Sequence, residues 1–160
     1  MKIRNGFYTT YRNLELKIFQ SRSEDELPIP EEEKPFLLYC DGTPCPFSDF
    51  IKSTVNNSYY KKVYRKDLDN AYSISTFAFL KGFTFSVRET ETDPDEIDIC
   101  TTDKNATNII DLRKVEISPT QYMYCARIKS QLLEKIWEER QPAFGLPMPL
   151  QMKNYEEIKT

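Results

Sequence analysis

The sequence predicts an α+β fold in which a mainly antiparallel, twisted β-sheet carries a C-terminal amphipathic helix packed on it. Two observations predict this class: a run of high β-propensity with a central turn over residues 71–88, and an apolar stripe at helical spacing over residues 128–137. A chain of 160 residues is long enough to bury one core without staples. We therefore expect a single α+β domain over residues 1–142.

Residues 71–88 predict the central hairpin, with its turn at Leu80-Lys81-Gly82. In the second strand, residues 83–87 place an apolar side chain at every second position, which is the pattern of a half-buried strand. In the first strand the apolar side changes near Thr76, which predicts a bulge or a loose register.

Other strands are predicted where short apolar or alternating runs end at turn residues. Residues 2–12 and 14–19 form a hairpin with a turn at Arg12-Asn13, and Leu14, Leu16 and Ile18 face inward. Residues 47–55 fit a helix with Ser48 as its N-cap, and a strand almost as well, while residues 66–70 fit one helical turn. Residues 21–35 hold three prolines and six acidic residues and predict a surface loop. Further strands are expected over residues 36–40, 59–65, 96–101 and 121–128.

The predicted helix is the last element of the domain. Its apolar stripe consists of Ile128, Leu132, Leu133, Ile136 and Trp137, and polar residues including Glu138 and Glu139 point away from it. Ser130 is the expected N-cap, and Pro142 ends the helix near residue 141. Residues 143–160 carry two prolines soon after Pro142 and predict an extended tail that lacks fixed structure in part.

Charge and sequence patterning restrict the class of partner. The net charge is −3, without the basic excess typical of nucleic-acid binders, so no nucleic-acid partner is expected. The N-terminus lacks the apolar segment of a secretory signal, and no window approaches 18 apolar residues. We therefore expect a cytoplasmic protein without a membrane segment, in which all four cysteines are reduced thiols.

Histidine is absent, which removes the most common general base and metal ligand. No nucleophile elbow, phosphate-binding loop or dinucleotide fingerprint is present, so we expect neither an enzyme nor a cofactor. Cys40, Cys45, Cys100 and Cys125 could form a four-thiolate zinc site, but the last two lie 25 residues apart in strand-like segments. Buried free cysteines, and no metal, are the expected outcome.

An acidic row follows the central hairpin and is the candidate partner-binding site. Along an extended strand, carboxylates at alternate positions project to one side and could attract a basic partner. The row lacks the glycine and the distal glutamate of a calcium-binding loop. The alternative is a solvated strand end. The row consists of Glu89, Glu91, Asp93, Asp95, Glu96 and Asp98.

Tyrosines alternate with basic residues over positions 59–66. Tyr59, Tyr60 and Tyr64, with their lysine and arginine neighbours, could stack on single-stranded nucleic acid. Because the chain has no net basic charge, an exposed strand protected by lysines is the favoured interpretation.

Four short motifs resemble the small immunity proteins that bacteria pair with secreted polymorphic toxins, although the opening motif is richer in tyrosine than this family's usual version. The resemblance implies a non-enzymatic cytoplasmic inhibitor that binds one cognate toxin domain, for example a nuclease, and blocks its active site. The alternatives are an accessory interaction module of phage or secretion-system origin, and a histidine-free enzyme. The motifs are I-R-N-G-F-Y-T-T-Y (3–11), D-L-D-N-A-Y (67–72), F-L-K-G-F-T-F-S-V (79–87) and I-W-E-E-R-Q-P (136–142).

Overall fold

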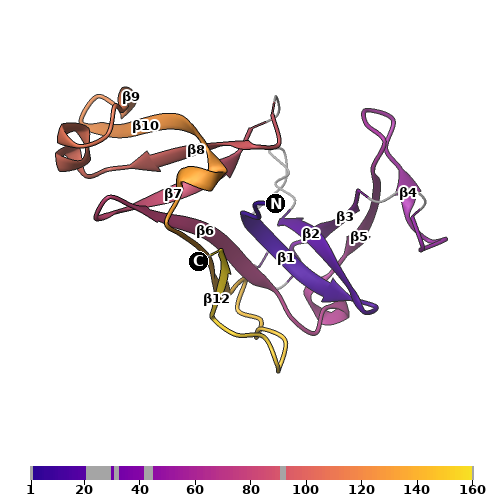
Figure 1. The fold of residues 1–160 in the computed structure, drawn as a ribbon. Helices are drawn as coiled ribbons and strands as arrows, with labels where there is room; N and C mark the ends of the chain where they lie inside the picture. The colour runs from indigo at the N-terminus through magenta and orange to yellow at the C-terminus, as the bar shows by residue number, and fades with distance from the viewer. Residues whose placement is uncertain (1, 21–29, 31–32, 42–44, 91–92, 160) are drawn as a thin grey trace. The chain divides into compact units, whose positions relative to one another are not determined.

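The computed structural model describes residues 2–20, 30, 33–41, 45–90 and 93–159. The fold is mainly β and is built from antiparallel strands (Figure 1). In the described part of the chain the helical segments are short 3₁₀ turns, and the longest spans five residues. The predicted α+β class is therefore wrong, although the predicted antiparallel sheet is present.

The chain divides into two compact units, and each is made of segments that are distant in sequence. Unit 1 contains Met1–Asn5, Ile74–Arg140 and Lys153–Thr160, and unit 2 contains Gly6–Ser73 and Gln141–Met152. The single domain predicted over residues 1–142 remains a prediction. The two units are defined by contacts, whereas a domain is a part of the chain that folds independently.

Unit 2 holds a sheet in the order β4-β5-β3-β2-β1, as Figure 1 shows. The predicted first hairpin is confirmed, with Arg12 and Asn13 both at positive φ as a two-residue hairpin turn requires. Leu16 and Ile18 are buried as predicted, whereas Leu14 is 40% exposed. The strands are β1 (Gly6–Tyr11), β2 (Leu14–Gln20), β3 (Phe36–Cys40), β4 (Ile51–Lys52) and β5 (Tyr59–Val63).

One face of this sheet forms the core of unit 2. Leu16, Ile18, Phe36, Leu38 and Val63 alternate along three strands and are all buried together. Partly buried side chains from other segments, including Phe144, complete this core. For residues 47–55 the helical interpretation is wrong, and the strand alternative is met in part by the short strand β4. The predicted helical turn after β5 is present as η2 (Arg65–Asp67).

Unit 1 holds a sheet in the order β6-β7-β8-β10-β9. Its core includes Phe85, Val87, Ile97, Ile99 and Ile136, which lie on one face of their strands. The 3₁₀ turn η3 (Lys104–Asn108) follows β8. The strands are β6 (Tyr72–Leu80), β7 (Phe83–Glu89), β8 (Glu96–Thr101), β9 (Arg113–Ser118) and β10 (Gln121–Lys129).

The central hairpin is confirmed as β6 and β7, joined by Lys81 and Gly82, both at positive φ. The predicted change of the apolar side near Thr76 is wrong, because buried and less buried side chains alternate along the whole of β6. The pairs with β7 run without a register shift from Phe77↔Ser86 to Leu80↔Phe83, and a bulge before these pairs remains a prediction. The buried face of β6 continues through Thr76, because its hydroxyl donates a hydrogen bond to the carbonyl oxygen of Arg4 at 2.6 Å.

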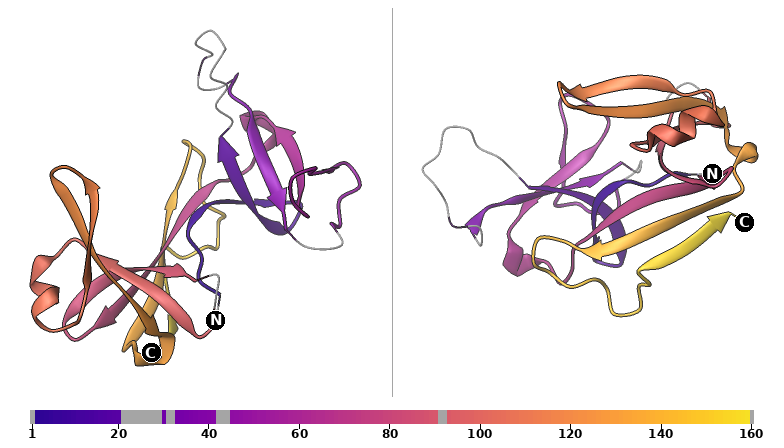
Figure 2. Two further views of the ribbon diagram at one scale, coloured as in Figure 1. Left: turned by 90° about the horizontal axis from the view of Figure 1, so that it is seen from above. Right: turned by 90° about the vertical axis from the view of Figure 1, so that its left-hand side faces the viewer.

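The predicted helix over residues 128–137 is wrong. This stretch instead contains the end of β10, the 3₁₀ turn η4 (Ser130–Leu132) and the start of β11 (Lys135–Pro142). β11 pairs with β6 and with β12 (Tyr155–Lys159), and Figure 2 shows β12 running beside β11. The segment predicted as an extended tail after Pro142 therefore contains a paired strand.

Candidate functional site

The predicted acidic row lies on the end of β7, on the following turn and on β8. Glu91 lies outside the described residues. Glu89 ends β7 and accepts a hydrogen bond from the backbone N–H of Ile3 at 2.8 Å. Asp95 lies exposed in the turn, and its backbone N–H donates to the Asp93 carboxylate at 2.9 Å. The remaining members, Asp93, Glu96 and Asp98, face cations on the neighbouring strand.

Two basic residues of β10 pair with three of these carboxylates. Arg127 donates from Nε and Nη2 to the two oxygens of Asp98 at 2.9 and 3.2 Å. Lys129 Nζ lies 3.0 Å from Asp93 and 3.4 Å from Glu96. These pairs form because Asp98 and Glu96 stand opposite Arg127 and Lys129 in the antiparallel register. Two cations thus offset part of the row's negative charge, which weakens its field towards a partner.

The pKa values follow from this pairing. The backbone N–H of Asp95 and then Lys129 stabilise the carboxylate of Asp93, so its pKa lies below the ordinary value. The Asp98 carboxylate raises the pKa of Arg127 in turn. The sequence could reveal these partners only if β10 were placed next to β8 in the correct register.

Two of the cysteines are joined in the middle of the same sheet. Cys100 of β8 and Cys125 of β10 face each other with a Cα–Cα distance of 4.2 Å and form a disulfide. The prediction of four reduced thiols is therefore wrong for this pair, while Cys40 and Cys45 lie outside the disulfide. The disulfide also removes Cys100 and Cys125 as zinc ligands. Within the described residues, no group of three or more acidic or cysteine side chains is placed to hold a metal ion.

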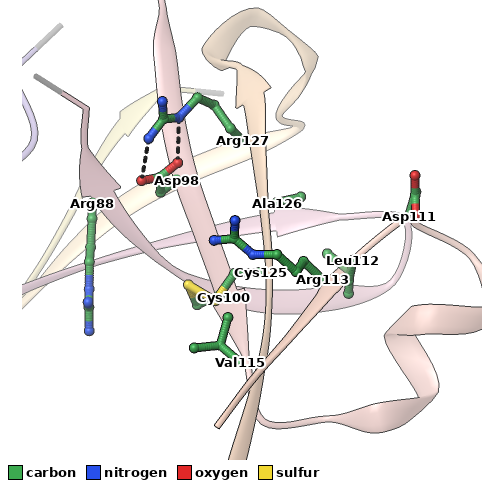
Figure 3. Close-up of a pocket in the computed structure, with 10 residues that line it drawn as sticks. All are labelled: Arg88, Asp98, Cys100, Asp111, Leu112, Arg113, Val115, Cys125, Ala126 and Arg127. Carbon is green, nitrogen blue, oxygen red and sulfur yellow. Dashed lines mark hydrogen bonds and ion pairs between the residues drawn. A yellow bond between two sulfur atoms is a disulfide. The ribbon is translucent and has the colours of Figure 1, made fainter. Parts of the chain in front are cut away.

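A hollow of about 670 Å³ opens above this disulfide on the face of the sheet opposite to the core. Three arginines line it: Arg88 of β7, Arg113 of β9 and Arg127 of β10. In Figure 3 the Arg113 side chain extends from β9 across the hollow, towards the strands that carry Asp98 and Arg127. The hollow therefore combines guanidinium groups with a floor of sulfur and apolar side chains.

Unit 2 exposes an aromatic surface on the side of its sheet opposite to the core. Phe19 and Tyr39 are in edge contact with ring centroids 5.2 Å apart, and Tyr39 lies 6.4 Å from Tyr60. Lys17 stands opposite Tyr39, and Lys62 stands opposite Leu37, so two cations flank the rings. Phe19 is 52% exposed. We call this surface the aromatic face: Lys17, Phe19, Leu37, Tyr39, Tyr60 and Lys62.

The predicted tyrosine group is divided between two faces of the sheet. Tyr60 belongs to the aromatic face, whereas Tyr59 packs against the core of unit 2. Tyr64 follows β5 and is 40% exposed. Sequence reasoning singled out Tyr60 but missed Phe19 and Tyr39, because they reach it only through the pairing of β2, β3 and β5.

The opposite side of the same sheet carries a small ionic cluster. Arg12 donates to both oxygens of Asp49 at 2.8 Å, and Lys61 also pairs with Asp49. The hydrogen bonds from Arg12 and Lys61 hold the pKa of Asp49 well below its usual range. Arg12 lies over the ring of Tyr11, with 4.8 Å between the guanidinium carbon and the ring centroid.

Among the residues that the structure describes, no helix has the length and apolar character needed to cross a membrane. The strands and the two exposed sheet faces define a mainly β protein whose candidate sites lie on sheet surfaces rather than in a deep cleft. The model of the family described as "Uncharacterised conserved protein UCP033725" matches residues 3–144, and the chain belongs to that family. No curated protein and no solved structure matches the chain.

Proposed function

We propose that this protein is a non-enzymatic binding module that neutralises a cognate toxin domain in the cytoplasm by protein–protein interaction. The observation that carries the proposal is the aromatic face, whose rings are held in fixed contact and are partly open to solvent. The motifs at residues 3–11, 67–72, 79–87 and 136–142 support the immunity class by resemblance.

The aromatic face has the composition of a protein-binding surface. Tyrosine and other aromatic residues supply much of the binding energy at interfaces, because they bury a large area at low entropic cost. On this face the strands already fix the rings, since Phe19, Tyr39 and Tyr60 lie on three paired strands. A partner would therefore bind a preformed surface, which reduces the cost of association.

The charges on the aromatic face suggest the chemistry of the partner surface. Lys17 and Lys62 are exposed beside the rings and favour a partner patch that carries carboxylates. The acidic row remains a second proposed contact, but Arg127 and Lys129 already offset two of its charges. We expect it to contribute less than the aromatic face.

The test is co-expression with the product of a toxin-like reading frame immediately upstream of this gene. The wild-type chain should rescue growth, and the double variant Phe19→Ala with Tyr60→Ala should fail to rescue it. The variant should bind the purified toxin domain about 30-fold or more weakly, because it removes two interface anchors. Leu150→Ala is the matched control, since Leu150 is a fully exposed apolar residue of unit 2 outside its strands.

Two outcomes would contradict the proposal. If the upstream product kills equally with and without the wild-type chain, the immunity function is wrong. If the double variant instead loses affinity for single-stranded oligonucleotide while toxin binding is unchanged, the aromatic face serves nucleic acid, since stacked rings between lysines also suit bases.

A further inference from the structure

The arginine-lined hollow of unit 1 lies apart from the aromatic face of unit 2 that carries the proposed function, and it shares only Asp98 with the acidic row. It lies over β8 and β10, and the disulfide Cys100–Cys125 forms part of its lining. Its volume of about 670 Å³ lies within the range of small-ligand sites in proteins. The hollow is fully contained in described residues of one compact unit.

The three arginines of the hollow differ in whether a carboxylate pairs with them. Asp98 stands between Arg88 and Arg127 in the strand register, but its carboxylate pairs with Arg127 alone. Within the described chain, neither Arg88 nor Arg113 has a carboxylate oxygen within 4.0 Å. Two guanidinium groups, one on β7 and one on β9, therefore border the hollow with N–H groups that are available to a ligand.

The remaining lining is apolar or negatively charged. Leu112, Val115 and Ala126 add apolar surface beside the disulfide. Asp98 and Asp111 also line the hollow, so three arginines and two aspartates leave a formal charge of +1. This charge matches a ligand with a single negative group, and a phosphate dianion would meet the two carboxylates as well as the arginines.

We propose that this hollow binds a small aliphatic monocarboxylate. The carboxylate accepts hydrogen bonds from Arg113, whose planar guanidinium group suits a two-oxygen acceptor, while Arg88 adds positive charge at the opposite rim of the hollow. The aliphatic body of the ligand covers the disulfide and the apolar side chains, which removes that surface from water.

Octanoate is the probe that tests this site on the full-length chain with its disulfide intact. Octanoate is added stepwise while the amide chemical shifts are recorded. The amides of β8, β9 and β10 should shift, and the shifts should reach saturation and yield an affinity. Arg113→Gln should weaken binding about 10-fold or more, because a charge-assisted hydrogen bond is lost. Arg88→Gln should weaken it as well, and affinity should fall as salt is raised.

Lys114→Gln is the matched control, because it removes the same charge from the next residue of β9. Lys114 lies over the ring of Tyr122, 4.0 Å from its centroid, and does not line the hollow. This variant should bind octanoate as the wild type does. Octylammonium and inorganic phosphate should cause no saturable shifts in these strands.

Several results would overturn the assignment. Octanoate that gives no saturable shift, shifts confined to other strands, or equal losses in Arg113→Gln and Lys114→Gln would each exclude this site. Phosphate that displaced octanoate and bound more tightly would show that the hollow selects a polyanion. Circular dichroism of each variant establishes that the sheet is unchanged, which is expected because both arginines are exposed.

Discussion

Glu138 on β11 is only 2% exposed, and two arginines approach it from different parts of unit 1. Arg4 donates from Nε and Nη2 to its two oxygens at 2.9 and 2.7 Å, and Arg140 Nη2 donates at 2.7 Å. Arg140 also pairs with Glu156 of β12 at 2.6 Å. A carboxylate buried without such partners would be neutral rather than ionised.

The balance of these effects sets the pKa of Glu138. Burial disfavours the charged form, but the hydrogen bonds and charges of Arg4 and Arg140 outweigh it, so the pKa lies below its ordinary value. Since the folded-state pKa is depressed, the stabilisation is present above the unfolded-state value. It is lost as the pH falls through the folded-state value.

We predict that Glu138→Gln lowers the free energy of unfolding by about 3 kcal/mol at pH 7, because it leaves two arginines without their buried counter-charge. The loss of stability on acidification should also become shallower in this variant. Urea unfolding between pH 7 and pH 3 measures both effects. Glu139→Gln is the control, since Glu139 is the exposed neighbour on β11, and an equal loss there would contradict the prediction.

The disulfide between Cys100 and Cys125 bears on the compartment in which the protein works. Bonds of this kind persist in oxidising compartments and are rare among cytosolic proteins. The cytoplasmic location therefore remains a prediction. The state of Cys100 and Cys125 in cells, measured by thiol alkylation, is the direct check on it.

At the scale of elements, β11 shows where prediction from sequence fails. The spacing of Ile128, Leu132 and Ile136 fits a helix, but a stripe over ten residues also fits a turn followed by a strand. The strand is selected by partners that the local sequence does not contain: Arg4, which lies 134 residues from Glu138, and Tyr155, whose ring centroid lies 6.4 Å from that of Trp137. Tertiary pairing thus overrides a short helical pattern.

Other elements could be predicted because their signals are local. β3 (Phe36–Cys40) and β8 (Glu96–Thr101) have the predicted bounds, since each is a short run that ends at turn residues. Of the candidate sites, the acidic row was visible in sequence, but the cations that compensate it were not. The aromatic face was visible only as Tyr60, because its other members depend on the strand register.

We predict that removal of β12, in a chain that ends at Met152, destabilises the protein by about 2 kcal/mol or more. The truncation deletes the backbone pairs with β11, the contact of Tyr155 with Trp137 and the Glu156–Arg140 pair. It also leaves one side of β11 as an open edge that can pair with another chain. Urea unfolding and size-exclusion chromatography measure the two effects, and an unchanged, monomeric chain would contradict the pairing.

At the scale of the whole molecule, the two units are interleaved along the sequence. Residues 141–152 belong to unit 2, although most of that unit precedes residue 74. Phe144 in this returning segment lies 5.1 Å from Phe36 and 4.9 Å from Phe7, measured between ring centroids. Backbone bonds between Ala143 and Ala71, and between Ala71 and Pro147, fix the same segment.

We predict that Phe144→Ala lowers the stability of unit 2 by about 2 kcal/mol, somewhat less than for a fully buried ring. Amide hydrogen exchange should become faster in β3 than in β8, because the lost contacts all lie in unit 2. Leu150→Ala provides the control from the same segment. Equal acceleration in β3 and β8 would instead show that the two units open together.

The composition of unit 1 also sets an order of events during synthesis. Its β11 takes a salt bridge from Arg4 and a paired strand from residues 155–159, so its partners come from near both ends of the sequence. On the ribosome the hairpins of β1–β2 and β6–β7 can form as they emerge, since their contacts are local. The Arg4–Glu138 pair can form only after β11 has emerged from the ribosome. Until then both side chains remain exposed and accessible to chaperones.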